Sequence, residues 1–486
     1  LVGPGYYHPH AGWRGLIHTD FNIQMMYWPT YASNHMDLGL VYYDFFYRHR
    51  GTMKEDTQAI YQIDGIKFPG LTDGTGRELA YIGCRTWMCV SAWCAQLYWW
   101  GYEYTQDREF LRQIAYPIMR EVAKFYRAYA IKGDDGKYHI FPSTAPEQSP
   151  WWATDPAIDI ALICVHMQAT LQASELLGED ADLRAGWRDL LDNLAPIPNN
   201  GEVFLDESAA APDKRLAHTG LLTVVYTAGL IGLGSPEEEQ AMARRTLAHL
   251  PTQTSRWVLD YPFDIPTWND DCNWQTLIAY AARLGLPEDA LQYAYDFGIF
   301  QHVKPNGLFA FDCPITEEQR ETRWGMPDSS YSFNAVVSEM FLQSYEGMIR
   351  IAPAVPSRWD ASLSGFLAVG AFEVDAEIRG GKAQWLAVHS LKGNRCRVVN
   401  PWVGQHVQVL KDGKDVPFAE IDGIIAFDTE AGGVYEIGPR GKVRRAPRMG
   451  LAEVESGPLS YVGPAFMGNI PENKRIALWV GLPPRA

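Results

Sequence analysis

The sequence predicts a mainly α-helical protein, an (α/α)6 toroid of about six helical hairpins followed by a small C-terminal antiparallel β-sandwich. Two observations predict this fold class. Between about residues 22 and 344, apolar residues recur with the period of a helix and are interrupted only by short loops rich in Gly, Pro, Asn and Asp. After Gly347, apolar residues alternate with small or polar ones, as they do in strands. A fixed repeat period is absent, which disfavours an open helical solenoid.

The helical part divides into consecutive pairs with short links, the pattern of stacked antiparallel helices. A ring of such hairpins closes without free ends and leaves a central funnel that loops line. We expect helices over residues 22–28, 35–49, 53–62, 86–103, 107–130, 156–177, 181–193, 217–233, 236–249, 270–284, 287–299 and 330–345.

The C-terminal part contains strands and hairpin turns. Gly380-Gly381 and Asp412-Gly413 are typical two-residue turns between antiparallel strands. The sequence therefore predicts a toroid over residues 1–347, a sandwich over residues 348–440 and an irregular tail over residues 441–486. We expect strands over residues 366–378, 384–390, 396–400, 406–410, 423–427 and 433–437.

Composition limits the choice of ligand. The net charge of −16 makes a surface that follows nucleic-acid phosphates improbable, so we expect no nucleic-acid partner. We also expect no membrane span, because no uninterrupted apolar run approaches the roughly 20 residues that a span needs. The 17 Trp and 25 Tyr residues favour a cleft that stacks on a neutral ligand, although helical cores rich in Trp have the same composition.

Seven cysteines are present, an odd number without any C-x-x-C motif, and most lie in apolar helical runs. They are typical of buried free thiols rather than of a disulfide framework or a zinc site. His8 and His10 have no matching cluster of further ligands, so we expect neither a metal nor another cofactor. The chain begins at Leu1 rather than Met, so we expect that its true N-terminus, with any signal peptide, is missing.

The first candidate site is the stretch of residues 18–29. It combines the acid Asp20 with two side-chain amides, one of them Asn22, and with a Tyr-Trp pair. This mixture suits a sugar, because hydroxyl groups need paired donors and acceptors while the apolar face of a pyranose packs on an aromatic ring. The structural alternative is that Asp20 caps a helix and that residues 25–28 form one turn of core helix.

The second candidate is Glu147, in a loop that two prolines stiffen and that two tryptophans follow. A carboxyl group beside apolar rings is partly desolvated. Desolvation raises its pKa and keeps it protonated near neutrality, as a general acid requires. The alternative is a capping box from Thr144 to Glu147, which Pro150 and the two tryptophans weaken.

The third candidate is Asp328, at the start of the last predicted toroid helix. Asp followed by Ser-Ser-Tyr and an apolar run is also a standard N-cap, and both roles are compatible. Three loops that each offer an acid or an amide at a helix start could converge at one mouth of the funnel. Hydrolysis of a glycosidic bond needs one carboxylic acid to protonate the leaving oxygen and one base to activate water or to attack the anomeric carbon.

Several segments resemble those of a known family and occur in the same order. The clearest are His-Thr-Asp-Phe-Asn with Gln-Met and Tyr-Trp-Pro at 18–29, and Pro-Ser-Thr-Ala-Pro-Glu at 142–147; the others are 107–117, 338–344, 351–356 and 370–375. Together they resemble glycoside hydrolase family 95, the inverting α-L-fucosidases and their α-L-galactosidase relatives. The resemblance implies hydrolysis of a terminal α-linked L-fucose, or of a related sugar, on an oligosaccharide.

The same resemblance implies roles for individual residues. Glu147 is the general acid, and Asp328 takes the proton of a water that the Asn22 amide helps to hold. The two carboxyl groups are then about 6.5 to 9.5 Å apart. Asp20 stands where the family has Asn, so it is either a further base or a ligand of a sugar hydroxyl.

Other positions depart from the family. Asp328 is followed by Ser-Ser-Tyr-Ser instead of Gly-Asn-Phe-Gly, residues 70–78 replace a His-rich loop, and Tyr226 stands near a missing histidine pair. The given sequence also contains no counterpart of the family's usual N-terminal β-domain, in line with the expected missing N-terminus. The reaction type therefore transfers better than the specificity for fucose. As a pocket rim we nominate aromatic and hydrogen-bonding residues, each with an equal core or loop alternative: His18, Trp13, Trp28, Arg85, Trp87, Trp151, Trp152, His218, Trp268 and Asn269.

Other functions are compatible with the sequence. One alternative is a phosphorylase or another sugar hydrolase on the same toroid. A phosphorylase would lack a base for water and would offer a phosphate cradle of backbone amides, Lys or Arg. Asp328 argues against it. A sugar-binding protein without catalytic activity would have no need to retain both Glu147 and Asp328.

Overall fold

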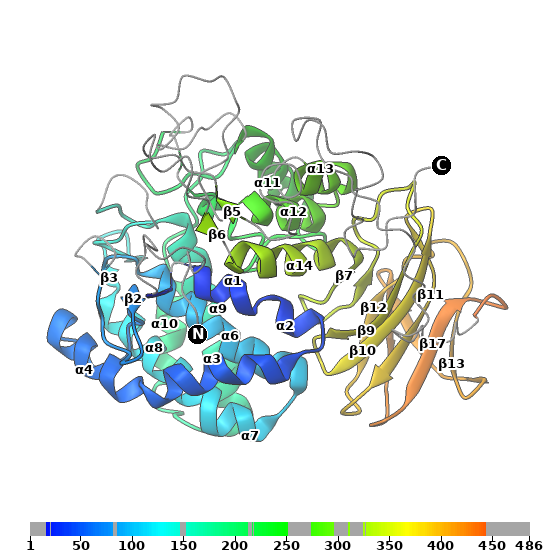
Figure 1. Cartoon of the computed structure of the whole chain (residues 1–486), viewed down its shortest axis with the longest axis horizontal. Coiled ribbons are helices and arrows are strands. Elements are labelled where there is room, and N and C mark those ends of the chain that lie inside the picture. Colours follow the sequence, from blue (N-terminus) through cyan, green and yellow to red (C-terminus); the bar gives the residue numbers. More distant parts are fainter. Residues whose placement is uncertain are drawn as a thin grey trace.

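The computed structural model describes residues 16–19, 21–80, 85–145, 152–211, 216, 218–250, 274–295, 310–311, 324–325 and 327–443. Figure 1 shows a helical body beside a body of antiparallel strands. The helical body is toroid-like, and its last helix leads into the strands. The predicted fold class is therefore confirmed.

A closed inner ring surrounds the centre of the toroid. Around the ring, α1 packs on α6, α6 on α9, α9 on the segment that contains the 3-10 helix η2, and α12 on α14, which returns to α1. Hydrogen bonds between the Thr219 hydroxyl and the hydroxyls of Thr276 and Tyr280 join the η2 segment to α12. The ring elements are α1 (Asn22–Tyr27), α6 (Cys89–Thr105), α9 (Ala157–Leu177), η2 (Gly220–Leu222), α12 (Trp274–Arg283) and α14 (Pro327–Phe341).

An outer layer of helices covers this ring. α8 shows why: its apolar residues, among them Ile118, Val122 and Phe125, are buried on one face against α6 and α9. The outer elements are α3 (Met36–Arg48), α4 (Arg50–Tyr61), α7 (Arg108–Phe110), the π-helix η1 (Leu111–Ala115), α8 (Tyr116–Tyr129), α10 (Arg184–Asp192), α11 (Glu237–His249) and α13 (Pro287–Tyr293); the short α2 (Pro29–Ala32) continues α1.

The inner helix α9 is long and apolar enough to cross a membrane by length and composition alone. In the structure it packs against α6, α8 and α10. Its apolar character on all sides therefore reflects its place inside the ring, where it has little contact with water.

The predicted helix over residues 217–233 is wrong. In its described part this stretch contains η2 and a series of turns, in which the amides of Leu230 and Ile231 both donate to the Val224 carbonyl. Leu221, Leu222, Val224 and Val225 are all buried. Periodicity cannot separate a segment buried on all sides from a helix, which explains the error. The other predicted helices are confirmed in their described parts, with shifted ends.

The C-terminal strands form two antiparallel sheets. The larger has the order β14-β13-β17-β11-β10-β9 and the smaller the order β12-β16-β15. Both predicted turns are confirmed, Gly380-Gly381 between β10 and β11 and Asp412-Gly413 between β13 and β14. The strands are β9 (Ala361–Ala368), β10 (Phe372–Arg379), β11 (Lys382–Ser390), β12 (Cys396–Val399), β13 (Val407–Lys411), β14 (Lys414–Asp415), β15 (Ala419–Ile421), β16 (Ile424–Phe427) and β17 (Val434–Pro439).

The predicted single strand over residues 366–378 is wrong. It is the end of β9 and most of β10, and a turn with positive φ at Gly370 and Ala371 separates them. The boundaries at residues 347 and 440 stay predictions. Short pairs elsewhere are β1 (Ile17–His18) with β2 (Leu71–Thr72), β3 (Ile131–Lys132) with β4 (Tyr138–His139), β5 (Ala310–Phe311) with β6 (Trp324–Gly325), and β7 (Leu342–Gln343) with β8 (Arg350–Ile351).

Among the described cysteines, Cys94, Cys164 and Cys396 are free thiols, as predicted, and Cys89 is buried. Cys84, Cys272 and Cys313 lie outside the described residues.

The β10–β11 turn gives a test of this packing. A Cβ at Gly381 (φ +70°) would lie 2.7 Å from the Val355 carbonyl oxygen, whereas a Cβ at Gly413 (φ +72°) would meet no atom within 4 Å. We expect Gly413→Ala to lower the free energy of unfolding by about 1 kcal/mol through backbone strain alone. Gly381→Ala should lower it clearly more, measured by urea unfolding. Equal losses would contradict the packing of this turn on residues 355 and 356.

Candidate active site

The N-terminal ends of α1 and α14 bring two predicted catalytic residues together. Nδ2 of Asn22 donates to Oδ2 of Asp328 over 2.5 Å, although 306 positions separate the two residues. Asp328 is fully buried and Asn22 is 7% exposed. Because α1 and α14 pack side by side in the ring, helix packing itself fixes this pair.

Neither helix start shows the N-cap that the sequence offered as an alternative. Asp328 lies in the first turn of α14, which begins at Pro327. The N-cap of α1 is Phe21, without a side-chain hydrogen bond, so Asp20 lies one position before the cap. Asp20 itself is outside the described residues.

The environment of Asp328 suits a base that works near neutral pH. Burial raises the pKa of its carboxyl to about 6, while hydrogen bonds from the Asn22 amide and the Ser329 backbone lower it. Oδ1 has no hydrogen-bond partner among the described residues. A buried polar atom without a protein partner points to a missing water or ligand. One oxygen is therefore held by an amide, and the other is available to accept a proton.

The loop that leads to Glu147 is pinned as far as Ala145. The amides of Ser143 and Ala153 exchange hydrogen bonds with each other's carbonyls, at 3.1 and 2.7 Å. Thr144 bonds to Thr86 twice, through its amide at 3.0 Å and its hydroxyl at 3.0 Å. The Thr144 hydroxyl thus has a partner other than a helix end, and the next described helix begins only at Ala157. Glu147 lies outside the described residues.

Asp159 also holds this loop, and sequence reasoning missed it. The Ser143 hydroxyl donates to Oδ2 of Asp159, which is fully buried in the first turn of α9. Burial raises the pKa of Asp159 to about 7, and the Ser143 hydroxyl lowers it. The available signal was an acid inside the otherwise apolar run Ala-Ile-Asp-Ile-Ala-Leu-Ile at 157–163.

We call the end of the ring at which α1 and α14 begin the front mouth. A small enclosed cavity of about 10 Å³ lies at this end. It brings together Phe21, next to Asn22, and Ala145, two positions before Glu147. Space of this size holds about one water molecule. Its full lining is Phe21, Trp93, Ala145, Ile158, Asp206, His218, Gly220, Thr223, Thr276 and Tyr280. The sequence had indicated His218 and had missed Asp206.

The remaining rim residues take several positions. His218 meets the Phe21 ring edge-on, with centroids 5.9 Å apart. His18 is half-buried in β1 and pairs with Leu71. Arg85 donates from Nε to the Ala80 carbonyl over 2.9 Å, a contact within the loop.

Among the nominated tryptophans, Trp87 is buried and Trp152 is 63% exposed. Trp13, Trp151, Trp268 and Asn269 lie outside the described residues.

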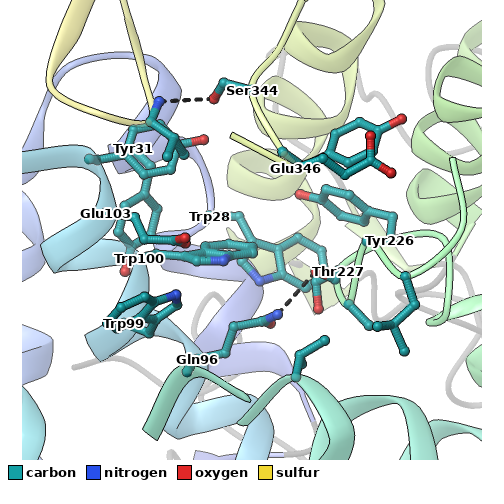
Figure 2. Close-up of a pocket in the computed structure, with 18 of the residues that line it drawn as sticks. Trp28, Tyr31, Gln96, Trp99, Trp100, Glu103, Tyr226, Thr227, Ser344 and Glu346 are labelled. Carbon is teal, nitrogen blue, oxygen red and sulfur yellow. Dashed lines mark hydrogen bonds between the residues drawn. The ribbon is translucent and has the colours of Figure 1, made fainter. Parts of the chain in front are cut away.

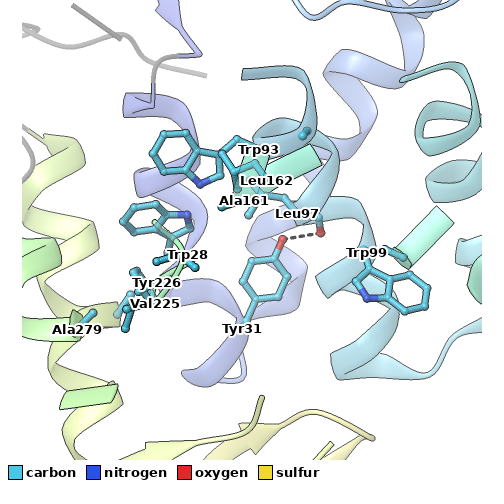
Figure 3. Close-up of a cluster of buried hydrophobic side chains, with 14 of the residues drawn as sticks. Trp28, Tyr31, Trp93, Leu97, Trp99, Ala161, Leu162, Val225, Tyr226 and Ala279 are labelled. Carbon is cyan, nitrogen blue, oxygen red and sulfur yellow. Dashed lines mark hydrogen bonds between the residues drawn. The ribbon is translucent and has the colours of Figure 1, made fainter. Parts of the chain in front are cut away.

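An aromatic layer closes the ring behind the front cavity. Phe21 stacks on Trp93 with centroids 4.7 Å apart and on Trp28 at 6.3 Å, and Trp28 meets Tyr226 edge-on at 5.3 Å. Figure 3 shows Trp28, Trp93 and Tyr226 in the buried cluster at the centre of the ring. Trp28 is 2% exposed, in line with the core alternative, and it does not line the front cavity. The structure thus gives no support for a sugar stacked on Trp28 at this mouth.

The described residues contain no group of three or more His, Cys, Asp or Glu side chains that could hold a metal ion.

The chain matches two domains of one family of known proteins. Residues 5–294 match the glycosyl hydrolase family 95 catalytic domain, and residues 343–437 match the glycoside hydrolase family 95, C-terminal domain.

Curated relatives match more distantly. The chain is 24% identical over 364 residues to alpha-L-fucosidase 2 of Arabidopsis thaliana. This match covers 71% of this chain and 41% of the relative. It is 26% identical over 145 residues to a kojibiose hydrolase of Flavobacterium johnsoniae. This second match covers 29% of this chain and 20% of the relative. The chain thus spans well under two thirds of the length of these relatives.

Among solved structures, the chain is similar to a putative kojibiose phosphorylase from human microbiome. The TM-score is 0.52 at 11% sequence identity, and the match covers 90% of this chain and 61% of that one. At this identity the likeness concerns the fold.

The buried charge of Asp328 gives a test by stability. The pKa of Asp328 in the folded protein, about 6, lies above its ordinary value of 3.8, so the protonated side chain favours the folded state. This stabilisation is complete below about pH 4 and is lost as the pH rises through 6. Asp328→Asn mimics the protonated form. At neutral pH we expect the variant to have a higher Tm than the parent and a free energy of unfolding that is larger by up to about 3 kcal/mol. Near pH 4 we expect no difference between the two proteins.

Calorimetry across this pH range checks the expectation, with the exposed Glu238→Gln of α11 as the control that leaves the profile unchanged. A lower Tm of Asp328→Asn at neutral pH would contradict it.

Proposed function

The chain belongs to glycoside hydrolase family 95, and from this premise we propose that it is an inverting exo-glycosidase that removes a terminal α-linked L-fucose, or a related sugar, from oligosaccharides. The glycoside hydrolase class follows from the family. The mechanism and the sugar are the proposed part. One observation carries the mechanism: a buried carboxylate, held by an amide through one oxygen, at the starts of two inner helices.

In the proposed reaction, Asp328 is the base. Asn22 holds its Oδ2, and its Oδ1 accepts the proton of the attacking water. A base with a pKa of about 6 is mostly ionised at neutral pH and still basic enough to take a proton. Water attack on the face opposite the leaving oxygen inverts the anomeric configuration.

Glu147 is the proposed acid, which protonates the leaving oxygen. The anchored backbone of residues 143–145 supports this role, because an acid acts efficiently only when its position is fixed. Asp159 is then a positioning residue, since it acts on the loop through Ser143. Asp20, one position before Phe21, is proposed to bind a hydroxyl of the sugar or to assist as a further base.

The names of the relatives suggest which substrates to test first. The Arabidopsis thaliana relative is named alpha-L-fucosidase 2, and an Aspergillus niger relative is named probable alpha-fucosidase A at 22% identity over 148 residues. These names support an α-L-fucoside as the first substrate. The kojibiose hydrolase of Flavobacterium johnsoniae makes kojibiose the second.

Hydrolysis is favoured over phosphorolysis by Asp328. A phosphorylase uses phosphate as its nucleophile and has no need of a base for water. A buried carboxylate with an unpaired oxygen is costly to maintain, and the unpaired Oδ1 of Asp328 supports a role in taking a proton from water.

Proton NMR during turnover tests the reaction. We expect release of one sugar, first as the inverted anomer, from a panel of α-L-fucosyl and α-L-galactosyl oligosaccharides and kojibiose. Glu147→Gln and Asp328→Asn should each lower kcat by about 10²-fold to 10⁴-fold because they remove the acid or the base, whereas the exposed Glu238→Gln should behave as the parent.

Retention of configuration, or full activity of either site variant, would refute the assignment. A product phosphorylated at the anomeric carbon in the presence of inorganic phosphate would favour the phosphorylase.

The pH dependence tests the role of Asn22 separately. Because the base must be ionised, kcat/KM should rise with pH through about 6. Asn22→Ala removes a hydrogen bond that stabilises the carboxylate, so the acid limb should move to higher pH. An unchanged acid limb in Asn22→Ala would show that another group controls it. Glu238→Gln again serves as the control.

A further inference from the structure

A second, larger cavity of about 320 Å³ lies at the other mouth of the ring. It is lined by residues from the later parts of the inner helices, among them Trp28 after α1, Glu103 of α6 and Glu339 of α14. Asp328 and Glu339 are eleven positions apart on α14, about 16 Å along a helix. Figure 2 shows Trp28, Trp100 and Glu103 around this cavity, which we call the rear cavity.

Aromatic rings form much of its wall. Trp28 and Tyr226 line it and belong to the aromatic layer behind the front cavity. Trp100 is half-buried and meets the Tyr31 ring edge-on, with centroids 5.3 Å apart. Flat apolar faces of this kind pack against the C–H faces of sugar rings.

Three buried polar atoms of lining residues have no hydrogen-bond partner among the described residues: Nε1 of Trp28, Oε1 of Gln96 and Nδ1 of His166. Nε2 of Gln96 donates to the Thr227 carbonyl over 3.0 Å, which leaves its oxygen as an acceptor. Nε2 of His166 lies 3.1 Å from the Met119 carbonyl, so the proton is on Nε2 and Nδ1 is an acceptor. These three atoms have almost no accessible surface, so they belong to the packed wall of the rear cavity and not to its open space.

The charges in the rear cavity are paired or suppressed. Arg283 donates to both carboxylate oxygens of Glu339, at 2.9 and 3.0 Å, and its guanidinium lies over the rings of Tyr226 and Tyr345. Burial raises the pKa of Glu103 to about 7, so this carboxyl is only partly ionised at neutral pH. An anionic ligand would find no unpaired Lys or Arg among the described lining residues, and a neutral ligand fits better than an anion.

We propose that the rear cavity is a binding site for a neutral sugar or polyol of monosaccharide size, distinct from the hydrolytic site. Its volume lies at the lower end of the range of about 300 to 1,000 Å³ that is typical of small-molecule sites. The aromatic rings, the volume and the ion pair of Arg283 with Glu339 lead to the same ligand class. This site does not rest on the proposed hydrolysis at the front mouth.

Calorimetric titration of the whole chain with L-fucose, D-galactose, D-glucose and myo-inositol tests the site. Two variants alter the rear cavity: Trp100→Ala removes a half-buried wall, and Ala169→Leu places a larger side chain in it from α9. Two controls alter the front mouth, Asp328→Asn and the exposed Trp152→Ala.

We expect at least one of these compounds to bind to the parent chain. Its affinity should fall about tenfold or more in each rear variant, equivalent to about 1.4 kcal/mol, and should be kept in both front variants. Asp328→Asn should at the same time lose hydrolysis, which separates failure of this site from failure of the proposed reaction. The proposal is overturned if none of the four compounds binds, or if both rear variants have the parent Tm and bind with the parent affinity.

Discussion

The contact between α1 and α14 is the constraint on which the rest of the structure depends. These helices lie near the two ends of the helical part of the chain, and their packing closes the ring. The hydrogen bond from Asn22 to Asp328 crosses the same contact. Ring closure and assembly of the site are therefore one event, because neither residue has its partner until the first and last inner helices meet.

Two buried carboxyl groups at the front mouth lower the stability of the folded protein. Asp328 and Asp159 are both fully buried, and each has one carboxylate oxygen without a partner among the described residues. Both begin inner helices, where the positive end of the helix dipole favours a carboxylate. Burial still dominates, since both pKa values are raised. The large aromatic core of the ring offsets this cost, as is common for functional sites in stable scaffolds.

Much of the fold could be predicted from the sequence, because periodicity reports which residues are buried and short polar loops report where helices end. The same signal failed at residues 217–233, where residues 221–227 are all buried and the backbone forms turns instead of a helix. Asn22 and Asp328 were nominated from helix starts and from the resemblance to family motifs, and the structure brings the two side chains together. Their catalytic roles stay predictions. Asp159 was missed because a single acid in an apolar helix resembles a core position. The direction that Trp28 faces depends on how the ring closes, which no local pattern contains.

The aromatic layer of Phe21, Trp93, Trp28 and Tyr226 is a wall that two cavities share. Phe21 and Trp93 line the front cavity, while Trp28 and Tyr226 line the rear cavity. Because these rings contact one another, a change in the packing of one ring reaches the walls of both cavities. The two ends of the ring are therefore separate in space but depend on one layer of side chains.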